Sequence, residues 1–393
     1  MDAVEPARGV VSGPLAPLEV AFRAELARQG YAPRTVRVLV RAMAKFSSWL
    51  EESELPPSAA TPPVVASLAG RSSGLGPVLR FLRGIDVVPG VDSMAAATPV
   101  EVVLGEFRAW LLAERGLAAQ SVRCYVTQAR PFLAHLSEPL DAALRGLDAG
   151  HVTSFMLGHC RDRNVETAQA AVTALRSLLR FLHVAGYVPV SLAAAVPAVA
   201  RWRLASLPRG LGDGQVQLLL DSCDVATVVG RRDHAVLTLL ARLGLRGAEA
   251  AALELGDVDW RSGELLIRGK GNRIERLPLP VPVGEALAAY VTGGRPRCDA
   301  TTVFVTVCAP LRPLSAMAVR QIMARACSRV GIARLGAHRL RHTLASDILR
   351  AGASLAEVGQ VLRHRSQLAT ATYAKIDEQA LRPLARPWPG GRS

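Results

Sequence analysis

Hydrophobic residues recur at helical spacing through the first half of the chain, and one stretch of this pattern occurs twice. Residues 22–50 resemble residues 107–136 when one inserted residue is allowed. The corresponding pairs are Phe22 and Phe107, Val36 and Val122, Phe46 and Phe132, and Leu50 and Leu136. Residues 79–82 and 179–182 both read LRFL, and Val-Pro occurs six residues later in each copy, at residues 88–89 and 188–189. Helical amphipathicity could mimic either match alone, but two matches in order favour a duplicated helical domain.

Arginines lie opposite the apolar face in both copies, as Arg34, Arg37 and Arg41 in the first and Arg123 and Arg130 in the second. We therefore expect two small all-helical modules that can lie along phosphates. The first covers residues 16–95, as a duplicate of the second at residues 97–190. The stretch 190–210 lacks a clear period and contains prolines and arginines, which predicts a basic linker over residues 191–207 that contacts a polyanion.

From about residue 208 the pattern changes to helices plus one hairpin, which predicts a third domain over residues 208–384. The segments LLIRG and RIERLPLP flank the turn Lys270-Gly271-Asn272, as expected of two antiparallel strands. An apolar helix over 234–243 should end at Gly244, and another should begin near Gly247. The whole chain is thus predicted to be multidomain and mainly α, with a flexible N-terminus at 1–15 and a disordered tail at 385–393.

Composition points to a nucleic-acid partner. The 393 residues include 47 Lys plus Arg against 33 Asp plus Glu, giving a formal net charge of +14. Such a balance favours a polyanion, nucleic acid before membrane, although a solubilising surface is the alternative. The 6 cysteines include no CxxC pair and read as reduced thiols. With no signal peptide and no apolar run of about 18 residues, we expect a cytoplasmic protein without membrane association.

Candidate chemistry begins with Arg246, which should lie just before a helix N-terminus that already favours an anion. The alternative is a structural salt bridge to Glu249. Lys270 is one of only three lysines in an arginine-rich chain. An ammonium, unlike a guanidinium, can give up a proton to a leaving alkoxide, so Lys270 is a candidate general acid. By itself, an ordinary turn residue would be the simpler interpretation.

Near the C-terminus, the sequence AHRLRH places His338 and Arg341 three residues apart, so that they point the same way on a helix. A basic solvated helix face is the alternative for this segment. Tyr373 follows the second cationic stretch, nine residues after His364. Neighbouring cations should ease the loss of the phenolic proton, which would let the oxygen attack phosphorus.

These residues together fit cleavage of a phosphodiester. Arg246, Arg341 and the histidines could neutralise the phosphoryl charge, Lys270 could protonate the departing sugar oxygen, and Tyr373 could hold the DNA covalently. The stored bond would make ATP unnecessary. No carboxylates are spaced to hold a metal, since Asp257 and Asp259 look like turn residues. We therefore expect neither a metal nor another cofactor.

In order and spacing, Arg246, Lys270, His338-x-x-Arg341, His364 and Tyr373 resemble the active-site set of the tyrosine recombinase (phage integrase) family. The resemblance implies an α+β catalytic domain with a small antiparallel sheet, preceded by helical SAM-like DNA-binding domains. It also implies that Arg246 and Arg341 bind the scissile phosphate, that Lys270 is the acid, that His338 and His364 assist, and that Tyr373 forms a 3′-phosphotyrosine link. The family commonly has Gly before its second histidine, where this chain has Arg363.

The resulting hypothesis is a site-specific DNA recombinase, an integrase or transposase of a mobile element. Its partners would be double-stranded DNA and further copies of itself, in a tetrameric synapse, with other recombinases of the same element as additional candidates. Two alternatives remain. A helix-turn-helix regulator would explain the charge and the segment 344–362, and a type IB topoisomerase-like enzyme would share the chemistry.

Overall fold

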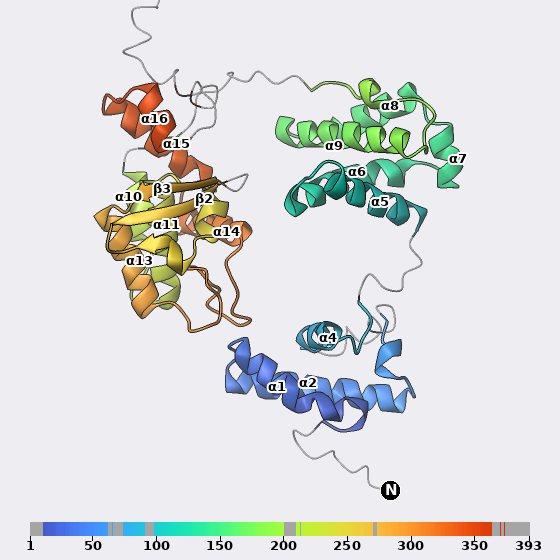
Figure 1. Cartoon of the computed structure of the whole chain (residues 1–393), viewed down its shortest axis with the longest axis horizontal. Helices are drawn as coiled ribbons and strands as arrows, with labels where there is room; N and C mark the ends of the chain where they lie inside the picture. The colour runs from blue at the N-terminus through green and yellow to red at the C-terminus, as the bar shows by residue number, and fades with distance from the viewer. Residues whose placement is uncertain are drawn as a thin grey trace, which may run out of the picture. The chain divides into compact units, whose positions relative to one another are not determined.

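The structure, a computed structural model, describes residues 11–61, 65, 74–90, 98–199, 210–212, 214–269, 273–363, 370 and 373. The chain separates into two compact units. Figure 1 labels their helices and strands. One comprises residues 1–57, 69–85 and 204–393, and the other comprises residues 58–68 and 86–203. The predicted N-terminal segment before Val11, the C-terminal tail and most of the predicted linker lie outside the described residues.

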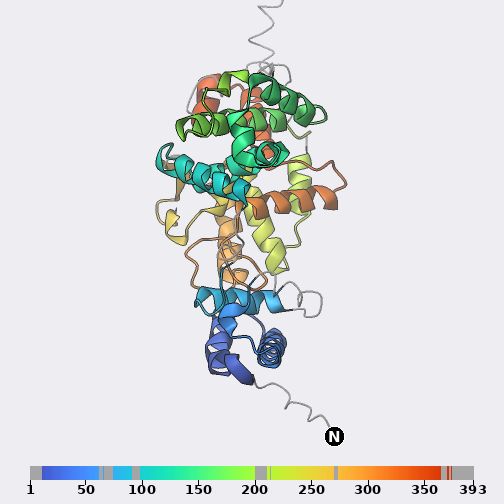
Figure 2. The same ribbon diagram turned by 90° about the vertical axis from the view of Figure 1, so that its right-hand side faces the viewer.

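The N-terminal helices form a small bundle around an aromatic pair. Its elements are η1 (Gly13–Leu18), α1 (Glu19–Arg28), α2 (Pro33–Glu52), η2 (Pro57–Ala59) and α4 (Leu75–Gly84). Figure 2 shows α1, α2 and α4 (blue) packed together. Phe22 of α1 is fully buried, and its ring centroid lies 5.0 Å from that of Phe81 on α4. This contact joins the two segments of the first copy that recur later in the chain.

The second helical module repeats this contact. Its elements are α5 (Pro99–Ala113), α6 (Ala119–His135), α7 (Leu140–Arg145), α8 (Ala149–Cys160), α9 (Val165–Val184) and η3 (Ala193–Ala195). Phe107 is fully buried, with its ring centroid 5.5 Å from that of Phe181. Leu192 and Val196 are also buried in this core, so the packed module extends past the boundary at residue 190 that the sequence predicts. The first part of the predicted linker is therefore part of the module.

The C-terminal region surrounds the buried helix α11. Its helices are α10 (Gln215–Asp221), α11 (Val228–Arg242), α12 (Gly247–Ala251), η4 (Leu255–Asp257), α13 (Val281–Gly293), α14 (Ala316–Arg329), α15 (His338–Arg350) and α16 (Leu355–Val361). Val236 and Leu240 of α11 are fully buried in a core that also includes residues of α13 and α14. Burial of this apolar surface is the main stabilising contribution to the region.

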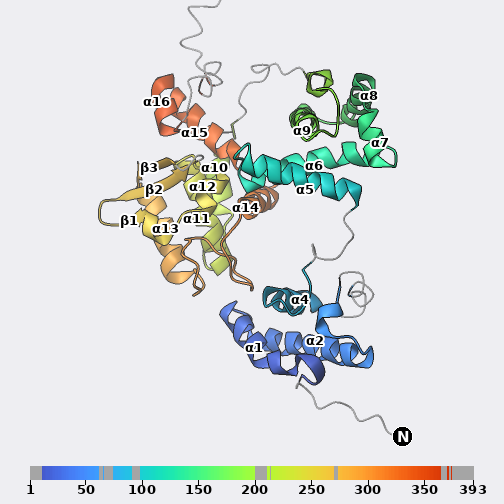
Figure 3. The same cartoon turned by 45° about the vertical axis from the view of Figure 1, so that its right-hand side comes forward.

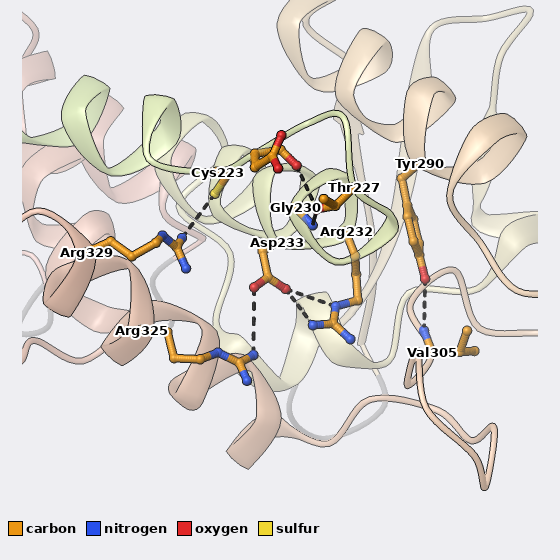
Figure 4. Close-up of polar contacts among 10 residues, drawn as sticks. Cys223, Thr227, Gly230, Arg232, Asp233, Tyr290, Val305, Arg325 and Arg329 are labelled. Atoms are coloured by element: carbon orange, nitrogen blue, oxygen red, sulfur yellow. Dashed lines mark hydrogen bonds and ion pairs between the residues drawn. The ribbon is translucent and has the colours of Figure 1, made fainter. Parts of the chain in front are cut away.

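Polar contacts also anchor α11 (Figure 4). The buried carboxylate of Asp233 lies 2.7 Å from a guanidinium nitrogen of Arg232 and 3.7 Å from one of Arg325 on α14. Arg329 of α14 lies 3.5 Å from the Cys223 sulfur. A buried carboxylate is tolerated only when it is paired. The pair with Arg325 joins α14 to α11, and the Arg329–Cys223 contact joins α14 to the end of α10.

A three-stranded antiparallel sheet completes the C-terminal region, in the order β1 (Val258–Asp259), β2 (Glu264–Gly269) and β3 (Arg273–Pro278). Leu265 and Ile267 of β2 are buried, whereas the residue between them is only partly buried. In the ladder, Gly269 pairs with Arg273 and Leu265 with Leu277, so the hairpin that the sequence predicts is confirmed. The mainly helical, multidomain fold with a small antiparallel sheet is likewise confirmed.

Two findings concern the described residues alone. None of their helices combines the length and apolar character needed to cross a membrane. Nor do these residues contain a group of three or more His, Cys, Asp or Glu side chains that could hold a metal ion.

Candidate active site

Arg246 lies where the sequence predicts it, in the turn between α11 and α12. The turn requires Gly244, which has a φ of 58° and whose Cβ, if present, would meet Leu344 and Leu362 at 3.1 Å. Arg246 then adopts an extended conformation as the N-cap of α12. Its side chain is 42% exposed, so the guanidinium remains accessible beside the helix N-terminus.

Glu249 holds Arg246 in two ways. One carboxylate oxygen accepts the backbone N–H of Arg246 at 2.9 Å, and the other accepts its Nη1–H at 2.6 Å. The salt bridge considered as the alternative at the sequence level is therefore present. It does not exclude anion binding, because it fixes one edge of the guanidinium and leaves a large part of the side chain exposed.

Arg341 of α15 is almost completely buried, at 1% exposure. Its Nη1 donates to the carbonyl of Gly244 at 2.6 Å, and its Nη2 donates to the carbonyl of Leu362. Burial, together with the nearby charges of Arg246 and Arg363, lowers the pKa of Arg341 to about 10. The guanidinium is still charged at neutral pH, so it is a fixed cation held between the Gly244 turn and the end of α16. A solvated basic face is thereby excluded for Arg341.

Two histidines of α15 contact each other one turn apart. The ring centroids of His338 and His342 lie 4.5 Å apart, and the rings meet edge to face. Burial lowers the pKa of His338, and Arg341 and Arg246 lower it further. Burial also lowers the pKa of His342 to about 4, with contributions from His338, Arg339 and Arg341. Both imidazoles are therefore neutral near pH 7 and can accept a hydrogen bond.

Tyr373 is 2% exposed and packs against Ala345, Val358 and Leu362, which belong to α15 and to the end of α16. Its hydroxyl oxygen lies 2.6 Å from Nδ1 of His342. Burial raises the pKa of Tyr373 to about 12, and the charge of Arg341 offsets only part of this effect. The expectation that the surrounding cations ease deprotonation is wrong for this site, because desolvation of the phenolate outweighs them.

The predicted site residues include some that the structure brings together and some that it does not describe, and one further residue was not predicted. The structure brings Arg246, His338, Arg341 and Tyr373 into one region: Arg341 bonds to the Gly244 carbonyl beside Arg246, and His342, one turn after His338, contacts Tyr373. Figure 3 shows the helices α12 and α15 that carry or adjoin the first three of these residues. Lys270 and His364 lie outside the described residues. Sequence reasoning missed His342 as the partner of Tyr373, although its position one turn after His338 placed it on the same helix face.

Comparison with known proteins shows the family of this chain. A model of the phage integrase family matches residues 211–380. Integrase/recombinase y4rA of Sinorhizobium fredii is 39% identical over 397 residues, covering 96% of this chain and 95% of that protein. Tyrosine recombinase XerD of Mycobacterium tuberculosis is 31% identical over 298 residues, covering 71% of this chain and 94% of that protein.

A solved structure of the XerH site-specific recombinase bound to a palindromic difH substrate, in a post-cleavage complex, shares the fold. Its TM-score is 0.54 at 18% identity, and the match covers 74% of this chain and 98% of that one. The chain therefore belongs to the phage integrase family. Within that family it is a site-specific tyrosine recombinase.

Proposed function

We propose that this recombinase cuts and rejoins duplex DNA at specific sites through a 3′-phosphotyrosine intermediate. The observation that supports this most strongly is the contact between the Tyr373 hydroxyl and His342, 2.6 Å long, beside the buried cation Arg341. A regulator that only bound DNA would have no use for a buried tyrosine paired with a neutral histidine. The DNA substrate named for the XerH structure gives independent support.

In the proposed cleavage step, the Tyr373 oxygen attacks the scissile phosphorus while its proton passes to His342. A bond forms between the tyrosine oxygen and phosphorus, and the bond between phosphorus and the 5′ oxygen breaks. The departing 5′ oxygen takes a proton from Lys270 and becomes a hydroxyl. Arg246 and Arg341 neutralise the phosphoryl oxygens, with His338 and His364 as further hydrogen-bond donors. Attack by the 5′ hydroxyl of another strand reverses these steps.

The resting site is protected against premature attack. Burial raises the pKa of Tyr373 to about 12 and lowers that of His342 to about 4, and both shifts oppose transfer of the proton from the hydroxyl to the imidazole. An anionic phosphate bound beside His342 would stabilise the imidazolium and raise the pKa of that residue. Binding of DNA would therefore itself favour removal of the phenolic proton.

Neither a metal nor ATP is required in this proposal. Arginines supply the positive charge at the phosphate, and the phosphotyrosine bond retains the free energy needed for rejoining. We expect cleavage to continue unchanged in excess EDTA. A chemical step that depends on added magnesium would contradict this part of the proposal.

The helical modules would hold the duplex. The equivalent aromatic contacts, between Phe22 and Phe81 and between Phe107 and Phe181, support a duplication of residues 97–190 in residues 16–95. The exposed arginines of α2 and α6 could then position phosphates in both modules. We propose a cytoplasmic enzyme of a mobile element that acts as a homo-oligomer, a tetramer at synapsis, with other recombinases of the same element as further partners.

The test is a suicide substrate, a duplex with a nick beside the cut site that traps the covalent complex. Tyr373→Phe should give no covalent complex and should bind DNA as tightly as the wild type, because only the nucleophilic oxygen is removed. Tyr290→Phe is the matched control, since Tyr290 is also fully buried in the C-terminal region and its hydroxyl accepts the Val305 N–H at 3.4 Å, away from the histidines. Covalent attachment of DNA to Tyr373→Phe would show that another residue is the nucleophile.

A further inference from the structure

Arg363 occupies a backbone position that favours glycine. It follows Leu362, the C-cap of α16, and has a φ of 55°, in the left-handed region. A residue with a Cβ is disfavoured there, and helices that end in this way usually have Gly at the position. The contacts of the Arg363 side chain show what an arginine adds at this position.

The Arg363 side chain does not extend into solvent. It is 5% exposed, and its Nη2 donates to a carboxylate oxygen of Glu249 at 2.7 Å. Its Nη1 lies 3.6 Å from a carboxylate oxygen of Glu275 on β3, which is too long for a hydrogen bond. Nε and Nη1 are buried and have no hydrogen-bond acceptor among the described residues.

Glu249 is the residue that Arg363 shares with Arg246. The same carboxylate oxygen accepts the Arg363 Nη2–H and the Arg246 backbone N–H, and the other oxygen accepts the Arg246 Nη1–H. The Glu249 side chain is only 4% exposed. Without Arg363, the buried carboxylate would be balanced by Arg246 alone, and the pair would be neutral. With Arg363, the three residues carry a net positive charge, which the partly exposed carboxylate of Glu275, 3.6 Å from Arg363 Nη1, offsets in part. The electrostatic influence of both arginines reaches Arg341.

We propose that Arg363 is a positioning residue of the recombinase site, which shares Glu249 with Arg246 and so leaves Arg246 both oriented and positively charged toward the scissile phosphate. The inference rests on the proposed function, in which Arg246 binds that phosphate. Arg363 acts through Glu249 and need not touch DNA. It would make the site of this recombinase more cationic than one with glycine at the same position.

A matched set of variants separates the side chain from the backbone. Arg363→Gly and Arg363→Ala both remove the guanidinium, but only Gly relieves the left-handed conformation. Both should lower the single-turnover rate of suicide-substrate cleavage at saturating DNA by about 10- to 100-fold, as is typical when a group that orients a reactive residue is removed. Arg363→Lys keeps the charge and should recover a large part of the rate. Wild-type cleavage by Arg363→Gly, with Ala alone impaired, would overturn the proposal.

A double-mutant cycle tests whether the effect passes through Glu249. In the background of Glu249→Gln, which removes the negative charge that Arg363 balances, adding Arg363→Gly should change the rate by less than about 3-fold. An Arg363→Gly defect of the same size with and without Glu249→Gln would show that Arg363 acts independently of that carboxylate. Thermal unfolding of each variant identifies any that fail to fold. If Arg363→Gly or Arg363→Ala fails to fold, the cleavage rate of Arg363→Lys is compared with that of the wild type instead.

Arg246→Ala distinguishes failure of the inference from failure of the proposed function. If Arg246→Ala cleaves like the wild type, Arg246 is not a phosphate ligand, and both proposals fall. If Arg246→Ala is strongly impaired but Arg363→Gly is not, the proposed function stands and only the role of Arg363 is overturned. Strong impairment of Arg246→Ala with little further decrease in the double variant Arg246→Ala, Arg363→Gly supports both.

Discussion

The helical module of residues 98–199 and the C-terminal region differ in whether they bury charged side chains. In the module, Arg123 and Arg130 of α6 are exposed, and Arg130 is ion-paired with Glu101. In the C-terminal region, several charged residues are buried. Among the described residues, the buried charged positions all lie there: Arg232, Asp233, Glu249, Asp257 and Arg341.

The difference separates binding from chemistry. An exposed arginine interacts with phosphates through a screened, sequence-independent attraction and is not held in one geometry. A buried arginine is desolvated at considerable free-energy cost, but it is fixed and acts in a medium of low dielectric constant. The C-terminal region can therefore stabilise a transition state, whereas the module can position the duplex. Three predictions test this division, in order of decreasing effect.

Substitution of Arg341 should have the largest effect. Arg341→Ala should lower the cleavage rate by roughly 10³-fold or more, as for other arginines that stabilise phosphoryl transfer. Arg341→Lys should recover little, because an ammonium cannot span the carbonyls of Gly244 and Leu362 as the guanidinium does. Arg123→Ala, on the exposed face of α6, should leave the rate at saturating DNA unchanged. Full activity of Arg341→Lys would mean that Arg341 serves only as a charge.

The buried histidine should make the C-terminal region sensitive to acid. The pKa of His342 is lowered in the folded state to about 4, so the unfolded chain binds a proton first as the pH falls below about 6.5. As the pH falls from about 6.5 to about 4, this difference in proton binding lowers the free energy of unfolding by up to roughly 3 kcal/mol.

His342→Gln should remove this part of the acid dependence. Chemical denaturation at about pH 7 and about pH 4.5, on either side of most of this titration, measures the change in unfolding free energy for variant and wild type. His151→Gln is a suitable control, because His151 is exposed on α8. An equal decrease in stability in His342→Gln and in the wild type would show that other groups cause the acid sensitivity.

The exposed arginines of α2 should have the smallest effect on chemistry. Replacing Arg34, Arg37 and Arg41 with Gln should weaken DNA binding and make the slope of log affinity against log salt shallower, by about 0.9 for each phosphate that is no longer neutralised. Cleavage at saturating DNA should not change. Arg28→Gln is the comparison, since Arg28 is also exposed but is paired with Glu25. An unchanged salt slope in the triple variant would indicate that this module contacts protein instead of DNA.

Sequence by itself determined the local features of this protein. The apolar run that ends at Gly244 predicts the turn that carries Arg246, strand alternation predicts the β2–β3 hairpin, and a spacing of three places His338 and Arg341 on one helix face. The order of aromatic residues in the repeat also indicated the two helical modules. These features depend on helix and strand periodicity and on glycine conformations, which neighbouring residues determine.

Only the tertiary structure decided which of these residues are buried and which ones meet. Tyr373 and His342 are 31 residues apart, and the Arg341 side chain and the Gly244 carbonyl are 97 residues apart. The sequence placed cations near Tyr373 and so suggested an acidic phenol, whereas packing against α15 and the end of α16 desolvates the hydroxyl and raises its pKa. Arg363 likewise reads in the sequence as a substitution for glycine, and only the fold brings it to Glu249. Burial depends on segments that are distant along the chain. The extent of burial then determines whether desolvation or a nearby charge has the larger effect on the pKa of a side chain.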